Sequence, residues 1–295
     1  MTYGQIGNLV GIWFAKHPKL WVNPLSVESI FRASTGFLRV LPDFLIIGAA
    51  KCGTTSLYNF MMKHPDIYPA LWKEIFFFDR YYPRGINWYR ANFPSKFQKF
   101  SKKLVKKNFL TGEATPTYIH HPLASQRVFE TNPKIKLIIL LRNPIERAYS
   151  HYQMEVSLGY ENKSFEVAIN LENERLSGEK EKMLMDKNYF SYKRQIFSYL
   201  SSGIYVDQLK IWMNQFPKEQ FLIIKTEDLA NKPQEILNQV FEFLNLAKFD
   251  MSKFEKYNLG KYSEMNNHIR KKLVNYFAPH NENLYKFLGN DFNWN

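Results

Sequence analysis

Apolar and polar residues alternate along the chain in a pattern that predicts both strands and helices. Short runs rich in apolar residues have the length of buried parallel strands, at 44–47, 109–112, 135–141 and 221–225. Apolar side chains at helical spacing predict helices at 54–63, 122–131, 145–157, 164–176, 189–200, 205–216 and 233–244. Strands that alternate with helices predict an α/β fold, a three-layer sandwich in which helices flank a central parallel sheet.

The chain of 295 residues is long enough for one α/β domain, which we expect to comprise residues 41–295. We expect residues 1–40 to be an N-terminal extension that packs on this domain. Aromatic and basic residues between 9 and 40 leave a second interpretation open, peripheral contact with a membrane surface. The segment 178–187 is polar and charged, which predicts a mobile loop.

The segment after the first predicted strand has the composition of an anion-binding loop. Gly48, Gly53 and the alanines between them leave backbone N–H groups free to surround an anion, and the helix predicted from Thr54 directs its N-terminus to the same place. The frame from Gly48 to Gly53 matches the nucleotide-binding P-loop and makes the fold P-loop-like, but Thr54 stands where that motif has its lysine. The loop lysine is Lys51, three residues earlier, so we expect a site that works without a metal.

A second anion-binding segment follows the third predicted strand. Asn143 is suited to cap the next helix and Pro144 to occupy its first position, which places Arg142 at the edge of the sheet. Two such segments on neighbouring strand ends predict a ligand with two phosphate-like groups.

The helix after Asn143 carries two further polar residues on one face. Arg147 and Ser150 are three residues apart, so a guanidinium and a hydroxyl can meet one phosphate. The alternative for Arg147 is a salt bridge to Glu146 or Asp79.

Both segments resemble those of the sulfotransferases that use 3′-phosphoadenosine 5′-phosphosulfate (PAPS), most closely the heparan-sulfate (glycosaminoglycan) branch and its bacterial relatives. The first reads Gly-x-x-Lys-x-Gly-Thr-Thr-Ser from Gly48, and the second reads Arg-Asn-Pro-Ile-Glu-Arg-Ala-Tyr-Ser from Arg142. The resemblance implies that Arg142 and Ser150 bind the 3′-phosphate. It implies that the 5′-phosphosulfate is bound by Lys51, Cys52, Gly53, Thr54, Thr55 and Ser56. PAPS is then the co-substrate, and no metal is expected.

Sulfuryl transfer needs a base that takes the proton of the acceptor, so a carboxylate or histidine must face the loop. The segment 73–79 resembles the Lys-Glu-x-x-Phe-Phe-Asp segment of glycosaminoglycan sulfotransferases, which implies that Glu74 is the base, while Lys51 stabilises the leaving oxygen. An ion pair of Glu74 with Lys73 or Arg80 is the alternative. Further candidates for the base stay open: Glu113, His120 and His121.

A third segment, near the C-terminus, resembles the late nucleotide-binding loop of the same family. This implies that Gly260 and Lys261 close over the 3′-phosphate and that Tyr262 covers the nucleotide. Tyr205 also follows a family-like pattern, but its helical spacing is equally typical of a core residue, so we do not include it among the site residues.

Composition narrows the class of ligand. The formal net charge of +13 at pH 7 favours anionic ligands, and Lys96–Lys107 is its most visible source. No nucleic acid is expected, because no motif for binding it is recognisable. Cys52 is the one cysteine, which excludes an intrachain disulfide and fits a reducing compartment, and no apolar stretch approaches the ~20 residues of a membrane helix. We therefore expect a cytoplasmic protein, and membrane association through residues 9–40 stays open as a second interpretation.

Together these features predict an enzyme that transfers a sulfuryl group from PAPS to a hydroxyl or amine of a carbohydrate, glycolipid or small-molecule acceptor by in-line displacement. Two other classes stay open, a P-loop kinase or NTPase and a non-catalytic protein that binds polyanions. The sequence identifies neither the acceptor nor the oligomeric state.

Overall fold

The centre of the computed structural model is a five-stranded parallel sheet with the strand order β2-β3-β1-β4-β5. The structure describes residues 27–105, 107–251, 253–254 and 263–294. In chain order the strands are β1 (Phe44–Gly48), β2 (Ile67–Pro69), β3 (Leu110–Ala114), β4 (Lys136–Leu141) and β5 (Phe221–Lys225). The predicted strands are thus confirmed, with ends shifted by a residue or two, and β2 was missed because it has only three residues and ends in proline.

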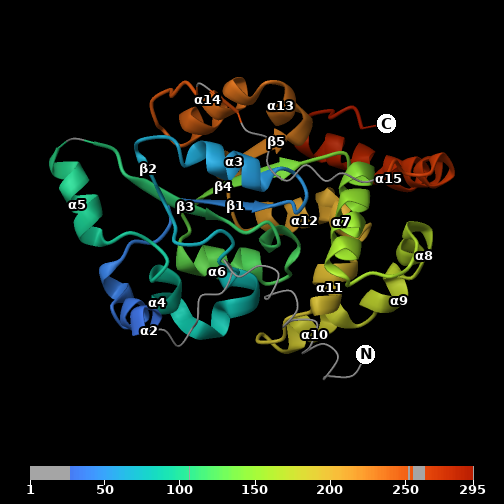
Figure 1. Cartoon of the computed structure of the whole chain (residues 1–295), viewed down its shortest axis with the longest axis horizontal. Helices are drawn as coiled ribbons and strands as arrows, with labels where there is room; N and C mark the ends of the chain where they lie inside the picture. The colour runs from blue at the N-terminus through green and yellow to red at the C-terminus, as the bar shows by residue number, and fades with distance from the viewer. Residues whose placement is uncertain (1–26, 106, 252, 255–262, 295) are drawn as a thin grey trace.

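Helices cover both faces of this sheet, as predicted. Helices α3 (Thr54–Met61) and α14 (Pro233–Phe243) lie over one face and α6 (Ala124–Thr131) under the other (Figure 1). Every residue of β1 is buried, and in β4 only Lys136 reaches the solvent, because helices enclose these central strands on both sides. The predicted three-layer sandwich is therefore confirmed.

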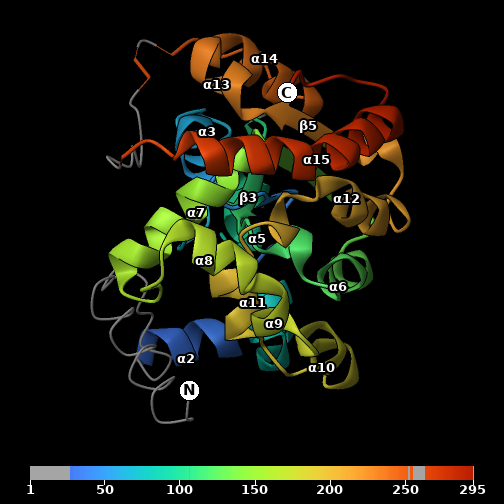
Figure 2. The ribbon, with the colours of Figure 1, turned by 90° about the vertical axis from the view of Figure 1, so that its right-hand side faces the viewer.

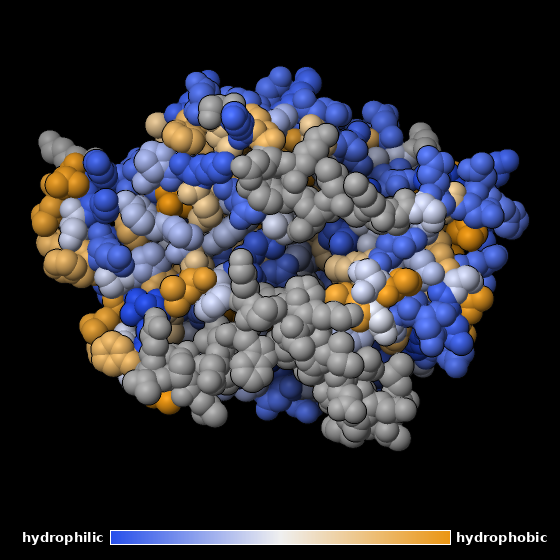
Figure 3. Space-filling view, viewed as in Figure 1, coloured by the Kyte–Doolittle hydropathy of each residue, from blue (hydrophilic) through white to orange (hydrophobic). Residues whose placement is uncertain are grey.

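The remaining helices surround this core. They are α2 (Val27–Ser34), α4 (Gly85–Arg90), α5 (Lys96–Leu104), α7 (Pro144–Leu158), α8 (Phe165–Asn170), α9 (Glu172–Leu176), α10 (Glu179–Met185), α11 (Tyr192–Phe197), α12 (Tyr205–Met213), α13 (Thr226–Asn231) and α15 (Asn267–Leu288). Figure 2 shows α7 between α15 and the group formed by α8 to α11. On the face shown in Figure 3 the coloured surface is largely hydrophilic, with hydrophobic patches that include the end of the molecule where α5 lies.

Two predictions about the segment between 164 and 187 were wrong. The helix predicted at 164–176 is broken at Leu171 into α8 and α9. The mobile loop predicted at 178–187 is mostly helix α10, because Met183 is buried and Glu179 accepts hydrogen bonds from Tyr189 Oη at 2.7 Å and Ser191 Oγ at 2.6 Å. A count of charges in the sequence does not show that one of these carboxylates is buried.

The described part of the N-terminal extension, residues 27–40, contacts α4. The Arg32 guanidinium donates to the carbonyl of Ala91 through Nε at 2.9 Å and Nη2 at 2.7 Å. Residues 1–26 lie outside the described residues, so packing of the whole extension stays a prediction.

A cluster of buried aromatic side chains supports the segment that follows Glu74. The Phe77 ring stacks on Tyr89 with centroids 4.4 Å apart and packs edge-on against Phe78 at 5.0 Å. Phe77 belongs to a single π-helical turn, η3 (Phe77–Tyr81), and its backbone N–H donates to Tyr118 Oη at 2.8 Å. The cluster therefore fixes the direction in which residues 73–76 approach the carboxyl end of the sheet.

We expect Phe77→Ala to lower the free energy of unfolding by about 3–5 kcal/mol, because it leaves a cavity in this buried stack. Phe97→Ala is the matched control: its ring is 77% exposed, so the change should stay within about 0.5 kcal/mol. Urea denaturation of both variants measures the difference, and equal losses of stability would contradict the structure of the cluster.

Candidate functional site

The loop between β1 and α3 has the backbone of an anion-binding turn. Gly53 precedes α3 with a φ of +83°, and Lys51 has a φ of +68°, in the left-handed region that a residue with a side chain rarely adopts. This conformation costs about 1–2 kcal/mol at a non-glycine residue, so the surrounding structure must hold it. The first amides of α3 point out of the helix end, where they have no partner within the helix itself.

Neighbouring strand ends hold this loop in place. The Ala49 N–H donates to the carbonyl of Leu140 in β4 at 2.8 Å, and Thr226 Oγ1, directly after β5, donates to the carbonyl of Cys52 at 2.7 Å. The Cys52 thiol is fully buried, and burial raises its pKa to about 11, so it is protonated at neutral pH. Cys52 therefore acts here as a small packing residue.

The second predicted segment begins α7 as expected. Asn143 Oδ1 accepts a hydrogen bond from the Ile145 N–H at 2.9 Å, and Pro144 is the first residue of the helix, so the predicted cap is confirmed. Arg142 Nη1 reaches the carbonyl of Lys51 at 3.4 Å, which joins the two segments directly.

Tyr205, which the sequence analysis left out of the site, connects both segments. Its buried hydroxyl donates to the carbonyl of Arg142 at 2.9 Å and lies 3.8 Å from Cys52 Sγ. Glu227 also contributes, since its Oε1 accepts from the Asn143 N–H at 3.0 Å. Glu227 directly follows β5 and Thr226, a position that marks the same sheet edge in the sequence.

The alternative proposed for Arg147 was wrong. Glu146 pairs instead with Arg270 at 2.6 Å, and Asp79 accepts from Thr117 Oγ1 at 2.5 Å. The Arg147 guanidinium is fully buried and donates through Nη2 to the carbonyl of Tyr199 at 2.6 Å. Arg147 therefore places a positive charge inside the domain, and its Nε and Nη1 have no hydrogen-bond partner there among the described residues.

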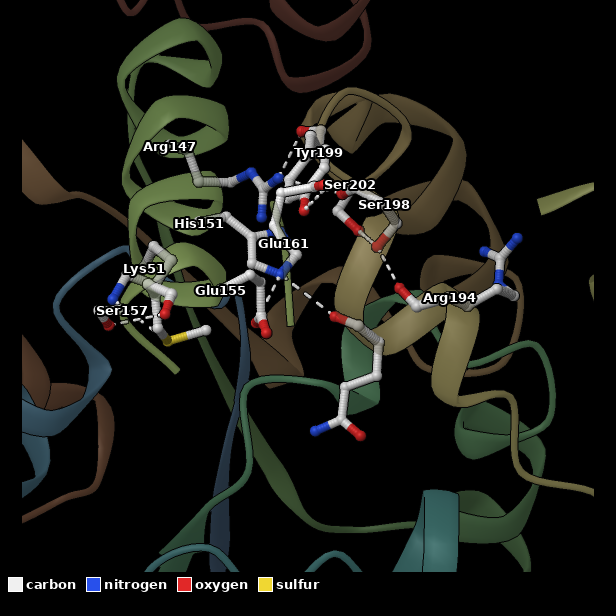
Figure 4. A network of polar contacts seen from close by, with 12 residues as sticks. Lys51, Arg147, His151, Glu155, Ser157, Glu161, Arg194, Ser198, Tyr199 and Ser202 are labelled. Carbon is white, nitrogen blue, oxygen red and sulfur yellow. Dashed lines mark hydrogen bonds and ion pairs between the residues drawn. The ribbon is translucent and has the colours of Figure 1, made fainter. Parts of the chain in front are cut away.

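Two more buried polar residues lie on the inner face of α7, one and two turns after Arg147. His151 and Glu155 follow Arg147 at intervals of four residues, and His151 Nε2 lies 3.3 Å from Glu155 Oε1 (Figure 4). His151 Nε2 also lies 3.1 Å from the carbonyl of Gln195, so this nitrogen carries the hydrogen. Neither residue was predicted, although their spacing from Arg147 is a signal that the sequence contains.

Lys51 lies at the edge of this buried group. Its Nζ contacts Met154 Sδ at 3.5 Å, and Lys51 takes part in none of the ion pairs found in the described part of the chain. Burial lowers the pKa of Lys51, Arg142 and Arg147 lower it further, and Glu155 and Glu74 oppose the change. Burial also raises the pKa of Glu155 to about 8.

Glu74 lies on the open side of the site. Its side chain is 27% exposed and pairs with Lys73 Nζ at 3.2 Å, and its charge is close enough to raise the pKa of Lys51. No hydrogen bond or ion pair joins Glu74 to Lys51 in the described part of the chain, so their joint role in catalysis stays a prediction. The ion pair with Lys73, the alternative interpretation, is present.

The rival bases are placed less favourably. Both oxygens of the fully buried Glu113 accept hydrogen bonds, from Tyr89 and Tyr118 at 2.9 Å each and from Thr115 at 2.6 Å. Burial raises the pKa of Glu113 to about 7. This carboxyl therefore supports the aromatic cluster from inside.

The two histidines line a small cavity together with Asp79 and Arg194. Burial lowers the pKa of His120 and of His121 to about 3, so both rings are neutral at physiological pH. Burial raises the pKa of Asp79 to about 6.

The remaining predicted ligand residues lie on α7 and near the C-terminus. Ser150 is buried two turns into α7, and Gly260, Lys261 and Tyr262 lie outside the described residues. Their assigned roles stay predictions.

Comparisons with known proteins agree on one family. The family model described as "Sulfotransferase domain" matches residues 41–285. The chain is 32% identical to "Membrane-associated sulfotransferase kil1" of Dictyostelium discoideum, over 88% of this chain and 68% of that protein. It is 29% identical to human "Heparan sulfate glucosamine 3-O-sulfotransferase 3B1", over 94% of this chain and 70% of that protein. Among solved structures, a sulfotransferase from Alicyclobacillus acidocaldarius superposes with a TM-score of 0.65 at 28% identity, over 86% of this chain and 99% of that one.

The pKa of Glu155 makes the stability of the protein depend on pH. Because the folded pKa of about 8 lies above the ordinary value of 4.5, ionisation of Glu155 costs nothing below pH 4.5 and costs most above pH 8. We expect Glu155→Gln to stabilise the protein relative to the wild type by a few kcal/mol more at pH 9 than at pH 5. Urea denaturation across this range tests the difference, with the exposed Glu166→Gln as a matched control, and a flat difference for Glu155→Gln would refute the assignment.

Proposed function

The chain belongs to the sulfotransferase domain family and is a sulfotransferase, and from this premise we propose that its donor is PAPS, that Glu74 is its base and that its acceptor is a carbohydrate hydroxyl or amine. The observation that carries the proposal lies at the carboxyl edge of the sheet: Arg142 Nη1 is 3.4 Å from the backbone carbonyl of Lys51, and the Arg142 charge lowers the pKa of Lys51. Two cations held this close, one of them largely desolvated, favour an anion between or beside them.

The residues of the site fit both charged ends of PAPS. The Lys51 ammonium and the first amides of α3 suit the 5′-phosphosulfate, since a helix N-terminus and a loop lysine both attract an anion. Arg142 and Ser150, from the end of β4 and from α7, would bind the 3′-phosphate. Tyr205 would hold both segments at a fixed separation, because it bonds to one and contacts the other.

Each catalytic step has a residue suited to it. The acceptor oxygen or nitrogen would form a bond to sulfur while the bond from sulfur to the 5′-phosphate oxygen breaks. Glu74 would take the proton that the acceptor loses, and Lys51 would stabilise the negative charge that develops on the leaving phosphate. Lys73, 3.2 Å from Glu74, would orient the carboxylate.

The acceptor and the location are proposed from the relatives. One is named for the 3-O position of heparan sulfate glucosamine, which favours a carbohydrate hydroxyl over a glycolipid or small alcohol. Another is named as membrane-associated, which supports membrane contact of this chain. We propose residues 9–40 as one contact and the cytoplasm as the location. In the residues that the structure describes, no helix is both long and apolar enough to span a bilayer. Family membership also favours sulfuryl transfer over the kinase and polyanion-binding alternatives.

We expect Glu74→Gln to lower kcat about 10²- to 10⁴-fold, because the variant cannot accept a proton. Glu113→Gln is the matched control: it changes the other candidate carboxylate, and it should lower stability while kcat stays within about tenfold of the wild type. Transfer of labelled sulfate from PAPS to heparan sulfate fragments measures both. Undiminished turnover of Glu74→Gln would remove Glu74 as the base.

Binding of the nucleotide can be tested apart from catalysis. We expect 3′-phosphoadenosine 5′-phosphate to raise the melting temperature of the wild type, and to do so much less for Lys51→Ala and Arg142→Ala, since a ligand stabilises only the state that binds it. ATP with magnesium serves as the comparison. Stronger stabilisation by ATP and magnesium would contradict the choice of PAPS as donor.

A further inference from the structure

Helix α5 presents its apolar side chains to the solvent, while two of its lysines contact the protein. Phe97, Phe100 and Leu104 follow one another at helical spacing on a single face and are 77%, 57% and 68% exposed. Val105, which directly follows the helix, is 62% exposed, and no residue of α5 is buried. An amphipathic helix of a water-soluble domain normally has the opposite orientation.

Lysines attach the other face of α5 to the domain. Lys99 Nζ pairs with Asp43 Oδ1 at 2.9 Å and lies 5.9 Å from the centre of the Phe109 ring. Lys102 Nζ lies 5.5 Å from the centre of the Tyr68 ring. These contacts fix the orientation of the helix, so the exposed apolar face is a feature of the folded domain.

The charge around this apolar face is positive. Residues 80–112 contain nine Lys or Arg residues and no Asp or Glu. Lys96 and Lys103 are exposed and lie beside the apolar face on the helix surface. Lys107, which follows the helix, is also exposed. In the space-filling view, hydrophobic side chains stand next to hydrophilic ones at the end of the molecule where α5 lies (Figure 3).

We propose that α5 docks this protein on an anionic membrane surface, with Phe97, Phe100, Leu104 and Val105 entering the boundary of the acyl chains and the flanking lysines binding lipid headgroups. The apolar residues favour a bilayer over a polyanion such as heparin, which would leave four large hydrophobic groups in water. The positive charge disfavours a second copy of this chain, because two such faces would repel each other.

The position of α5 gives the docked protein a direction. Its anchor Asp43 directly precedes β1 and Phe109 directly precedes β3, so α5 lies at the amino edge of the parallel sheet. Lys51 and Arg142 follow the carboxyl ends of β1 and β4, at the opposite edge. Docking through α5 therefore leaves the candidate active site facing away from the lipid.

The test is sedimentation of the full chain with anionic vesicles of phosphatidylcholine that contain roughly 30% phosphatidylserine, to imitate an anionic cytoplasmic leaflet. Vesicles of phosphatidylcholine alone serve as the comparison. We expect the wild type to bind the anionic vesicles and to lose most of this binding in high salt. Phe97→Ser with Phe100→Ser should weaken binding at least about tenfold. Lys103→Gln with Lys107→Gln should weaken it about fivefold for each charge removed.

Matched controls separate α5 from general hydrophobicity and charge. Leu184→Ser with Met185→Ser removes two apolar side chains of α10 that are 49% and 86% exposed, and Lys271→Gln with Lys272→Gln removes two exposed lysines of α15. Both should bind vesicles like the wild type. Phe31→Ser with Phe37→Ser tests the neighbouring apolar residues of the N-terminal segment.

A second measurement does not depend on removal of side chains. Cys52 is fully buried, so an environment-sensitive fluorophore on Phe97→Cys reports on this position alone, and its emission should shift to the blue with anionic vesicles. Sulfuryl transfer to a soluble acceptor should stay unchanged in the Phe97→Ser, Phe100→Ser variant, so docking and catalysis fail independently.

Several outcomes would overturn the proposal. They are absence of wild-type binding to anionic vesicles, vesicle binding that survives Phe97→Ser with Phe100→Ser, loss of binding only in the Phe31→Ser, Phe37→Ser variant, and a concentration-dependent dimer that the α5 variants abolish.

Discussion

Positive charge held out of water at the carboxyl edge of the sheet is the constraint on which the rest of the structure depends. Lys51, Arg142 and Arg147 lie near enough to one another that both guanidinium groups lower the pKa of the lysine. Burial of such charges is costly unless they are paired, and the described ion pairs supply no direct partner to Lys51. An excess of positive charge of this kind favours binding of an anion, because a bound anion would supply the negative charge that no described ion pair gives to Lys51.

The scaffold that maintains this excess of positive charge is made of short bonds between elements far apart in the sequence. Tyr205 on α12, Thr226 after β5 and Leu140 in β4 each hold part of the loop or the strand end beside it. None of these bonds neutralises a cation, since their acceptors are uncharged carbonyls. Glu155 is nearest to a counterion, yet burial raises its pKa to about 8, so at neutral pH it is mostly protonated. The protein therefore fixes the positions of its cations without pairing Lys51 to any carboxylate that the structure describes, and burial lowers the pKa of this lysine.

Local chemistry made part of this site predictable from the sequence. Asn143 and Pro144 determine the start of α7 within a few residues, and the small residues around Lys51 require a tight turn wherever they fold. Burial was beyond such reasoning: Glu74 precedes an aromatic-rich segment and Glu113 lies within β3, but only the fold shows that three hydroxyls enclose Glu113. The same limit applies to α5, whose lysine count was visible while the orientation of its face was not.

Helix α5 and the Lys51 loop lie at opposite ends of the sheet. If the protein docks on a membrane through α5, this separation limits which acceptors can reach the site. The five residues of β1 separate Asp43, at the α5 end, from the loop of Lys51, a span of roughly 16 Å at the usual rise of a parallel strand. An acceptor group in the same bilayer would have to extend beyond this length and around the domain to meet Glu74. A sugar chain or a soluble acceptor meets this condition, whereas the headgroup of a simple lipid does not. Docking through α5 and a carbohydrate acceptor, both of them proposals, are thus mutually consistent, because a protein docked in this way would not reach a compact lipid acceptor in the same bilayer.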